Sequence, residues 1–459
     1  MRLRTHRGTV AVLAATAVTG IAAATTALAA PSPAQVTAGR NAATWLTSQV
    51  EGGVLTNFGM PDIGLTIDVL LALEATGVSA ATAATVTDAI AAKAATFSYY
   101  EIDYDGDGDD DRIVDAGSTA KLLVAAVSTG RDPKAFGGLD LDAMTRRLIA
   151  TSGPHRGRVR DTTPEVYGGD ASNTFDQSLA VLGLVRSGGV PQDVVTYLIK
   201  QQCPAGGFRL NPDPAGASCA ADDSSDVDST GMAVQALLAA GDTTGAAAAA
   251  AKGAAWLKAR QGADGSFVNG PQRPDPNLPA GPNSNSTGLA GQALAAAGYT
   301  AEADKAAAWV AALQLTSGTD SGALAYEQAD FAEGAIDDMR RDRWRRATAQ
   351  ALLTLAQVPL GELGRSPSTP PSASASAGAS APPSASASAS ASSPASASAS
   401  ASGSAPGGAS VAPSTSSSTA PGGRLPVTGQ PIMRMVAVAV ALVTAGAVLL
   451  LVTRRRRSP

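Results

Sequence analysis

Histidine, cysteine and aromatic residues are scarce in this chain. Its 459 residues include two histidines and two cysteines, and Phe, Trp and Tyr together make up 4%. His6 lies in the N-terminal segment, and His155 lies in a Gly- and Arg-rich stretch that we predict to be a loop. Protein zinc sites are built mainly from Cys, His and carboxylate ligands, so no zinc is expected here.

The chain also lacks an excess of positive charge. Its formal net charge is −5, and no stretch of the predicted folded part resembles a basic groove. Because nucleic-acid binding depends on basic patches that contact phosphates, no nucleic-acid partner is expected.

Residues 1–29 have the three parts of a secretory signal peptide. The basic start "MRLRTHR" is followed by an apolar run and by small residues, with the predicted cleavage between Ala29 and Ala30. A membrane-spanning anchor is the alternative and fits less well, because a Pro-rich stretch follows directly. The mature chain is therefore expected outside the cell, where Cys203 and Cys219 should form a disulfide.

The C-terminal region contains a second predicted targeting signal. Residues 425–429 read LPVTG, residues 435–452 are an apolar run just long enough to cross a bilayer as a helix, and residues 454–459 are basic. This order resembles the sorting signal of sortases in Gram-positive bacteria. The resemblance implies cleavage between Thr428 and Gly429 and covalent attachment to peptidoglycan at the cell surface. A permanently membrane-anchored protein is the alternative.

Residues 364–423 consist almost entirely of Ser, Ala, Pro and Gly. Such a composition cannot bury enough apolar surface to offset the entropy of ordering the chain. We predict a disordered stalk between the folded part and the anchor.

Six pairs of helices recur along residues 33–358. The second helix of each pair ends near a Gly or a short polar break, and the six read "GLTIDVLLALEATG", "GSTAKLLVAAVSTG", "FDQSLAVLGLVRSG", "DSTGMAVQALLAAG", "NSTGLAGQALAAAG" and "RRATAQALLTLAQ". Their predicted N-caps are Ser118, Asn173, Ser229 and Ser286. The pattern predicts an all-α domain of six helical hairpins, and it leaves an open solenoid and a closed ring as alternatives.

One stretch favours the closed ring. "KGAAWLKARQGADGSF", residues 252–267, resembles the QW repeat of the squalene cyclase and protein prenyltransferase superfamily, with Phe267 in place of the usual last Trp. Weaker copies contain Tyr197, Gln201 and Phe208, then Trp45 and Gln49, then Trp309 and Gln314. The resemblance implies an α/α toroid, an (α/α)6 barrel. In it, the Gln and the aromatic residue clamp successive outer helices.

An acidic stretch at residues 103–111 matches the start of an EF-hand-type calcium loop. The predicted ligands are Asp103, Asp105, Asp107, Asp109 and Asp111. The twelfth position is Val114 instead of Glu, and Asp115 comes one residue late. We expect a structural calcium ion between the helices of the second hairpin, and a solvated acidic loop is the alternative.

A second acidic motif reads "DVDST". It resembles the D-x-D-D-T motif of squalene–hopene-type cyclases, whose acid protonates the substrate, but Ser229 replaces the third acid. The resemblance makes Asp226 and Asp228 candidate catalytic residues of a cyclase-like isomerase, with Asp228 as its acid. A similar cap-plus-acid pattern recurs in other repeats, which favours a structural role for Asp228 at the helix dipole.

A closed ring would bring the loops that enter the inner helices to one mouth. The candidate ligand-binding residues in these loops are Asp170, Asp176, Asp222, Asp223, Asp337 and Asp338. Two of these carboxylates could form the acid–base pair of an enzyme acting on polysaccharide. A cyclase would need more aromatic residues to stabilise carbocations than this chain has. The sequence therefore favours a non-catalytic module for an unidentified extracellular ligand over an enzyme.

Overall fold

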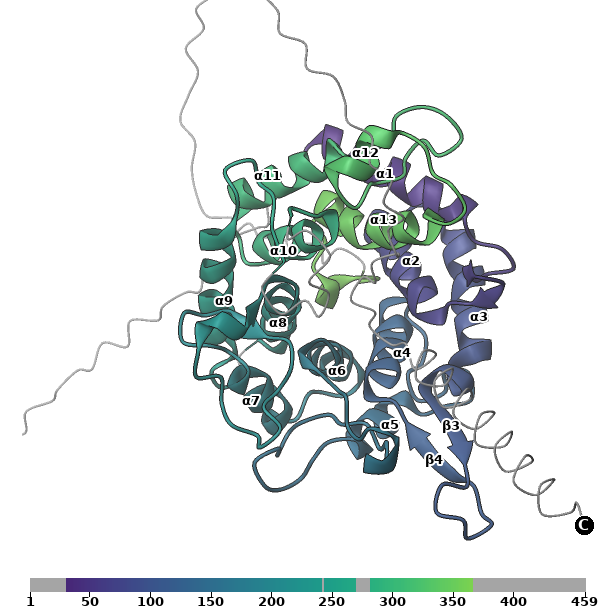
Figure 1. Ribbon diagram of the computed structural model, residues 1–459, viewed down its shortest axis with the longest axis vertical. Coiled ribbons are helices and arrows are strands. Elements are labelled where there is room, and N and C mark those ends of the chain that lie inside the picture. The colour runs from purple at the N-terminus through teal and green to yellow at the C-terminus, as the bar shows by residue number, and fades with distance from the viewer. Residues whose placement is uncertain (1–29, 242, 270–280, 366–459) are drawn as a thin grey trace, which may run out of the picture. The chain divides into compact units, whose positions relative to one another are not determined.

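The computed structural model describes residues 30–241, 243–269 and 281–365, in which six inner helices are surrounded by outer ones (Figure 1). The inner helices are α2 (Ile63–Thr76), α4 (Ala116–Ser128), α6 (Thr174–Ser187), α8 (Val227–Ala240), α10 (Ser284–Ala296) and α13 (Arg341–Ala356). The outer helices are α1 (Pro33–Ser48), α3 (Ala80–Ser98), α5 (Leu141–Arg147), α7 (Gln192–Lys200), α9 (Ala246–Arg260) and α11 (Thr300–Ala311). These are the six predicted hairpins.

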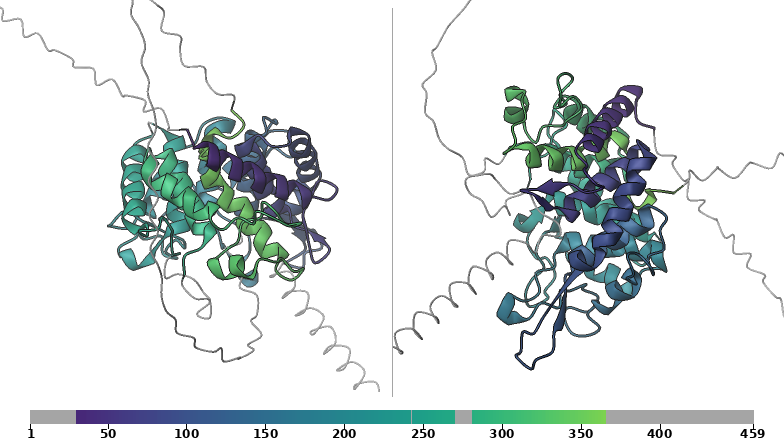
Figure 2. Two further views of the ribbon diagram at one scale, coloured as in Figure 1. Left: turned by 90° about the horizontal axis from the view of Figure 1, so that it is seen from above. Right: turned by 90° about the vertical axis from the view of Figure 1, so that its right-hand side faces the viewer.

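Short elements decorate the loops that lead into the inner helices. They are the antiparallel pairs β1 (Thr56–Asn57) with β2 (Met60–Pro61), β3 (Tyr99–Ile102) with β4 (Asp111–Val114), and β5 (Phe208–Arg209) with β6 (Ser225–Asp226). Helix α12 (Gln328–Glu333) and the 3-10 turns η1 (Glu165–Tyr167), η2 (Asp222–Ser224) and η3 (Leu360–Glu362) complete the described elements. The β3–β4 hairpin projects from the ring (Figures 1 and 2).

The inner helices form a closed ring. Each packs against its two inner neighbours in the order α2, α4, α6, α8, α10 and α13, and α13 returns to α2. The outer helices α11 and α1, from the last and first hairpins, are also in contact. The open solenoid is therefore excluded, and the predicted arrangement of hairpins is the one observed.

The inner helices are buried between the outer helices and the ring axis. Helix α4 is the extreme case, because each of its residues is buried. Many of these residues are Ala, whose small side chain combines a high helix propensity with close approach of neighbouring helices.

Each of the first five inner helices begins with an acidic or amide N-cap. Asp62, Asp115, Asn173, Asp226 and Asn283 accept hydrogen bonds from backbone N–H groups of the first turn. The prediction was right for Asn173 and wrong for three helices, whose caps lie three residues earlier than Ser118, Ser229 and Ser286. These serines instead donate their own backbone N–H to the capping side chain. Asp and Asn are strong N-caps, and the charge of Asp also complements the helix dipole.

Glutamine side chains link each outer helix to the next one. Gln261 Nε2 donates to the carbonyls of Gly265, in its own loop, and Glu302, in α11, at 3.0 and 2.8 Å. Gln314 makes the corresponding bonds to Gly322 and to Ala38 of α1, at 3.0 and 2.9 Å. The last outer helix is thus joined to the first across the ring seam.

Two of the predicted clamp glutamines have other roles. In the second copy the clamp is Gln202, which donates to the carbonyls of Gly206 and of Ala249 in α9, whereas Gln201 accepts from Arg209. Gln49 accepts a hydrogen bond from Arg345 of α13 and does not reach α3. The clamp needs a side chain that faces the next outer helix, and a shift of one residue turns the side chain away.

Glycine is required where these loops touch the next outer helix. Gly265 has φ of 95°, and a Cβ there would lie 2.4 Å from the carbonyl oxygen of Lys305. Gly322 has φ of 100°, and a Cβ there would lie 2.3 Å from the carbonyl oxygen of Asn41. Both the left-handed backbone and the close approach exclude a side chain.

After α13 the chain closes one end of the ring. We call residues 358–364 the floor segment, in which Leu360 is 4% exposed and Leu363 is fully buried. Gln292 donates to the carbonyl of Val358 at 2.6 Å, and Leu360 N–H donates to Gln235 at 3.0 Å. The folded part therefore continues beyond Val358, where the sequence suggested that it ends.

The predicted disulfide is present between Cys203 and Cys219. The signal peptide, most of the stalk, the LPVTG motif, residues 435–452 and the basic tail lie outside the described residues, as does Ala29. Among the residues that are described, no helix has the length and apolar character needed to cross a membrane.

Candidate functional site

All inner helices begin at the same end of the ring, which we call the mouth. Ala116, Thr174 and Ser284, the first residues of α4, α6 and α10, each donate a backbone N–H to the loop that leads into the next inner helix. The floor segment closes the opposite end. A ligand can therefore approach the ring axis from the mouth.

Entering loops are pinned to the inner helices by a repeated threonine. The hydroxyls of Thr66, Thr230, Thr287 and Thr348 accept from backbone N–H groups of the loops at 2.8–3.0 Å. Two of those N–H groups belong to Phe208 and Phe267, which are 0% and 1% exposed. These two phenylalanines are therefore core residues of the clamp and do not offer a face to a ligand. The recurring Thr in the aligned helices was the sequence signal for this contact.

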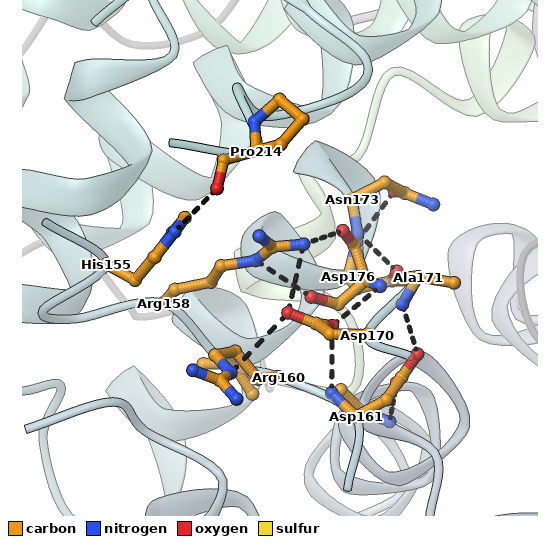
Figure 3. Close-up of polar contacts among 12 residues, drawn as sticks. His155, Arg158, Arg160, Asp161, Asp170, Ala171, Asn173, Asp176 and Pro214 are labelled. Carbon is orange, nitrogen blue, oxygen red and sulfur yellow. Dashed lines mark hydrogen bonds and ion pairs between the residues drawn. The ribbon is translucent and has the colours of Figure 1, made fainter. Parts of the chain in front are cut away.

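Four carboxylates gather at the mouth between α4 and α6. Asp161 accepts from the backbone N–H groups of Ala116 and Ala171 at 2.8 and 2.9 Å. Asp170 accepts from Asp161 N–H at 3.1 Å and pairs with Arg158 at 3.1 Å. Figure 3 shows Asp161, Asp170 and Asp176 close together beside Arg158. Asp115, the α4 cap, completes this group, which we call the carboxylate cluster.

Burial and mutual repulsion raise pKa values within the carboxylate cluster. Burial, followed by repulsion from Asp115, raises the pKa of Asp161 to about 6. The same two causes, in the same order, raise the pKa of Asp176 well above its ordinary value of 3.8. The cluster therefore holds carboxyl groups that can be protonated near neutral pH. Asp161 was not among the predicted site residues, because its proximity to Asp115 arises only in the folded ring.

Asp226 and Asp228 lie in the first turn of α8. Asp226 caps the helix, its Oδ1 accepting from Ser229 N–H at 2.7 Å. Asp228 is 1% exposed, two residues further along. Asp226 thus has the cap role that the sequence assigned to Ser229, and the structural role of Asp228 at the helix dipole stays a prediction.

The remaining candidate ligand-binding residues do not come together. Asp222 lies in η2 and accepts from Ala205 N–H at 2.6 Å, and Asp223 is exposed beside it. Asp337 and Asp338 are exposed in the loop before α13, where Asp337 pairs with Arg340 at 3.0 Å. Only Asp170 and Asp176 of the six belong to the carboxylate cluster.

A small cavity lies on the ring axis. It is lined mainly by apolar side chains, including Leu71, Phe175, Leu179, Met232, Leu289 and Leu360, and has a volume of about 50 Å³. That space suffices for a few water molecules at roughly 10–15 Å³ each. It is far below the roughly 300 Å³ at which pockets for larger organic ligands begin.

One ion pair interrupts the apolar lining. Lys121 Nζ of α4 lies 2.7 Å from Asp68 Oδ1 of α2, and the two side chains are 3% and 17% exposed. Each is a charged residue in a run of apolar residues near the middle of its helix, which is a sequence signal for a buried ion pair. Together they give the cavity a polar side next to an apolar one.

The predicted calcium loop connects β3 and β4. Asp103, Asp105 and Asp107 offer carboxylate oxygens that lie within 4.8 Å of one another, whereas Asp109 and Asp111 are not part of that group. Asp115, the candidate for the late bidentate ligand, instead caps α4. Carboxylate oxygens are the donors that calcium prefers, so three of the five residues fit the ion.

Comparisons with known proteins found similar solved structures and no related sequence family. No protein-family model matches the chain, and no curated relative matches it. A solved protein from Actinoplanes is 21% identical, covers 70% of this chain and 99% of its own, and has a TM-score of 0.46. An unsaturated glucuronyl hydrolase specific for heparin is 10% identical (71% and 99% covered, TM-score 0.48). A type II terpene cyclase from Scytonema is 16% identical (71% and 98%, TM-score 0.46).

Proposed function

We propose that the ring is a non-catalytic ligand-binding module whose ligand is held at the mouth. The observation that carries this proposal is the small size of the axial cavity, which leaves no room for an isoprenoid substrate inside the ring. One of the two acids of the cyclase-like motif, Asp226, is also committed to capping α8. We therefore assign the ligand to the loops of the mouth.

An enzyme that acts on polysaccharide is the second candidate. The observation in its favour is the carboxylate cluster, where Asp161 and Asp176 have raised pKa values beside ionisable neighbours. A protonated carboxyl and an ionised one are the pair that glycoside hydrolysis uses. Against it, the oxygens of Asp161 both accept backbone hydrogen bonds, which commits them to holding the loops.

The full-length protein, incubated with isoprenoids, neutral and acidic glycans, and peptides, tests both candidates. A ligand that raises the melting temperature and is recovered unchanged by mass spectrometry supports the binding module. Turnover that is lost in Asp228→Asn would establish the cyclase-like isomerase, and turnover lost in Asp176→Asn would establish the glycan-active enzyme. Asp88→Asn is the matched control, because Asp88 has an exposed side chain on the outer helix α3, away from the mouth.

We further propose that the chain is exported and attached to the cell wall through the LPVTG motif, on a disordered stalk. The proposal rests on the order of signal peptide, Ser/Ala-rich stretch, motif, apolar run and basic tail. Sortase and peptidoglycan are the implied partners. Deletion of residues 425–429 should move the protein from the wall fraction to the membrane or the medium, and an unchanged wall fraction would contradict the proposal.

Calcium binding at the β3–β4 loop is also proposed, as a structural role. Three carboxylates lie close together there, and their mutual repulsion would be relieved by a divalent cation. Its effect would be local, because the hairpin projects away from the ring.

A further inference from the structure

The β1–β2 hairpin presents an aromatic side chain that the fold does not use. Phe58 is 80% exposed, and Met60 beside it is 54% exposed. The turn between the strands consists of Phe58 and Gly59, with φ of 49° and 77°. A left-handed backbone is unfavourable for a bulky residue, and Asn or Gly is the usual choice at this place in such a turn. The isolated chain thus gains neither backbone relaxation nor burial from Phe58.

Strained backbone and exposed aromatic side chains both concentrate at binding sites. Phe58 combines the two features at the mouth of the ring. Its position is at the seam, since β1 and β2 lead into α2, the inner helix that packs against α13.

A cation without an acidic partner lies next to this hairpin. The other α13 arginines have carboxylate partners: Arg341 pairs with Asp320, Arg343 with Glu327, and Arg346 with Asp62. Among the described residues, no carboxylate lies within ion-pair distance of Arg345. Its Nε donates to Gln49 Oε1 at 3.2 Å, and its Nη1 donates to the carbonyl of Thr56 at 3.1 Å.

The guanidinium of Arg345 has capacity for a further acceptor. It carries five N–H donors, and the bonds to Gln49 and Thr56 use two of them. Burial, and then repulsion from Arg341, lowers the pKa of Arg345, which fits a cation whose charge is not locally neutralised. The charges of Asp342 and Glu51 oppose this effect. An incoming carboxylate would complete the hydrogen bonding of this group.

The hairpin keeps the two features close together. The carbonyl of Thr56 accepts from Arg345, and Phe58 follows two residues later, a step that spans at most about 7 Å of chain. A sugar ring can stack on an exposed aromatic face while its carboxylate reaches a neighbouring arginine. A chain of such sugars can lie across the mouth without an enclosing pocket, which suits the single projecting Phe58.

We propose that Phe58, Met60 and Arg345 form a subsite for an acidic polysaccharide, with a sugar ring on Phe58 and its carboxylate on Arg345. This inference rests on the proposed ligand-binding function and names the class of ligand and the place where it binds. The proposed binding site is therefore basic and aromatic and lies at the seam, whereas the sequence predicted a binding site of acidic residues.

The test uses full-length protein and a polygalacturonate fragment, with its methyl ester as a matched neutral probe and poly-glutamate as an acidic peptide. Binding by calorimetry should be strongest for polygalacturonate and should weaken about tenfold for the ester. Arg345→Gln should weaken it about tenfold to a hundredfold, since a charge-assisted hydrogen bond is lost. Phe58→Ala should weaken it about tenfold.

The matched controls are Val166→Ala and Arg156→Gln, which alter an apolar residue of η1 that is 77% exposed and an exposed Arg, both away from the seam. Both should bind polygalacturonate like the unaltered protein, and melting curves should show that all variants are folded. Unchanged affinity in Phe58→Ala and Arg345→Gln would overturn the subsite. If poly-glutamate bound as strongly as polygalacturonate, and Phe58→Ala did not weaken that binding, the site would be assigned to acidic peptides. That outcome would also overturn the polysaccharide subsite.

The same experiment separates this inference from the proposed function. Binding of a probe that neither variant weakens leaves a ligand-binding module with a site elsewhere. If the protein binds no glycan, peptide or isoprenoid, both the subsite and the proposed ligand-binding function are contradicted.

Discussion

Lowering the pH from 7.5 to 5 should stabilise this fold, because of the carboxylate cluster. The pKa of Asp161 is raised from its ordinary value of 3.8 to about 6 in the folded protein. Between these values the folded chain binds more protons than the unfolded chain, so stability rises as the pH falls through 6. The pKa of Asp176 is raised too, so its contribution has the same sign.

The size of the effect follows from the difference between the two pKa values. A difference of about 2.2, at about 1.36 kcal/mol for each unit, corresponds to about 3 kcal/mol for Asp161 when the pH is low enough to protonate it in both states. About half of that should be gained by pH 5, because the gain accumulates below the folded pKa. Groups with lowered pKa values, such as Asp142 and Asp320, lose their contribution only below about pH 4.

Denaturant unfolding at pH 7.5, 6 and 5 and constant ionic strength measures this effect, alongside Asp176→Asn and the exposed control Asp338→Asn. The amide resembles a protonated carboxyl, so Asp176→Asn should raise the free energy of unfolding at pH 7.5 and flatten its pH dependence. A free energy of unfolding that falls from pH 7.5 to 5 would refute the reasoning. The reasoning would also be refuted if Asp176→Asn lowered the free energy of unfolding by the same amount at all three pH values.

Three further predictions concern other parts of the molecule. Replacing Cys203 by Ser should cost about 3 kcal/mol in the free energy of unfolding, since the disulfide closes a loop with a sequence separation of 16; the same loss should appear when the unaltered protein is reduced, and an equal stability of both forms would contradict it. Calcium at millimolar concentration should protect the amides of the β3–β4 loop from hydrogen exchange; an unchanged exchange rate, or the same protection in Asp103→Asn, would count against the site. Phe58→Gly should raise the free energy of unfolding by about 1 kcal/mol, because the strain of a left-handed residue is removed; a lower melting temperature would show that Phe58 supports the fold.

The helices and their pairing could be read from the sequence, because each inner helix is a long apolar run that ends at a turn residue. The closed ring followed from the repeat around Gln261, since this side chain joins one outer helix to the next. The N-caps were placed three residues late in three helices. Both Asp226 and Ser229 are good cap residues, and only the backbone conformation decides between them.

The candidate site was predicted less well, because it depends on contacts between distant residues. Asp161 acquires its raised pKa from Asp115, and Arg345 reaches Gln49 and Thr56 only where the last hairpin meets the first. Local sequence patterns carry no information on such pairs. Acidic residues were judged available for a ligand, whereas most of those at the mouth hold the loops in place.

The floor segment also determines how the ring responds to a pull on its C-terminal end. Arg365 lies two residues after Leu363, which is fully buried and whose carbonyl accepts from Arg186 at 2.6 Å. Tension from beyond Arg365 would act on these contacts before it reaches α13, so the first mechanical event would be withdrawal of Leu363 and Leu360 from the axis. A ring that is pulled at its C-terminal end would therefore yield first at the floor segment, while the loops of the mouth stay intact.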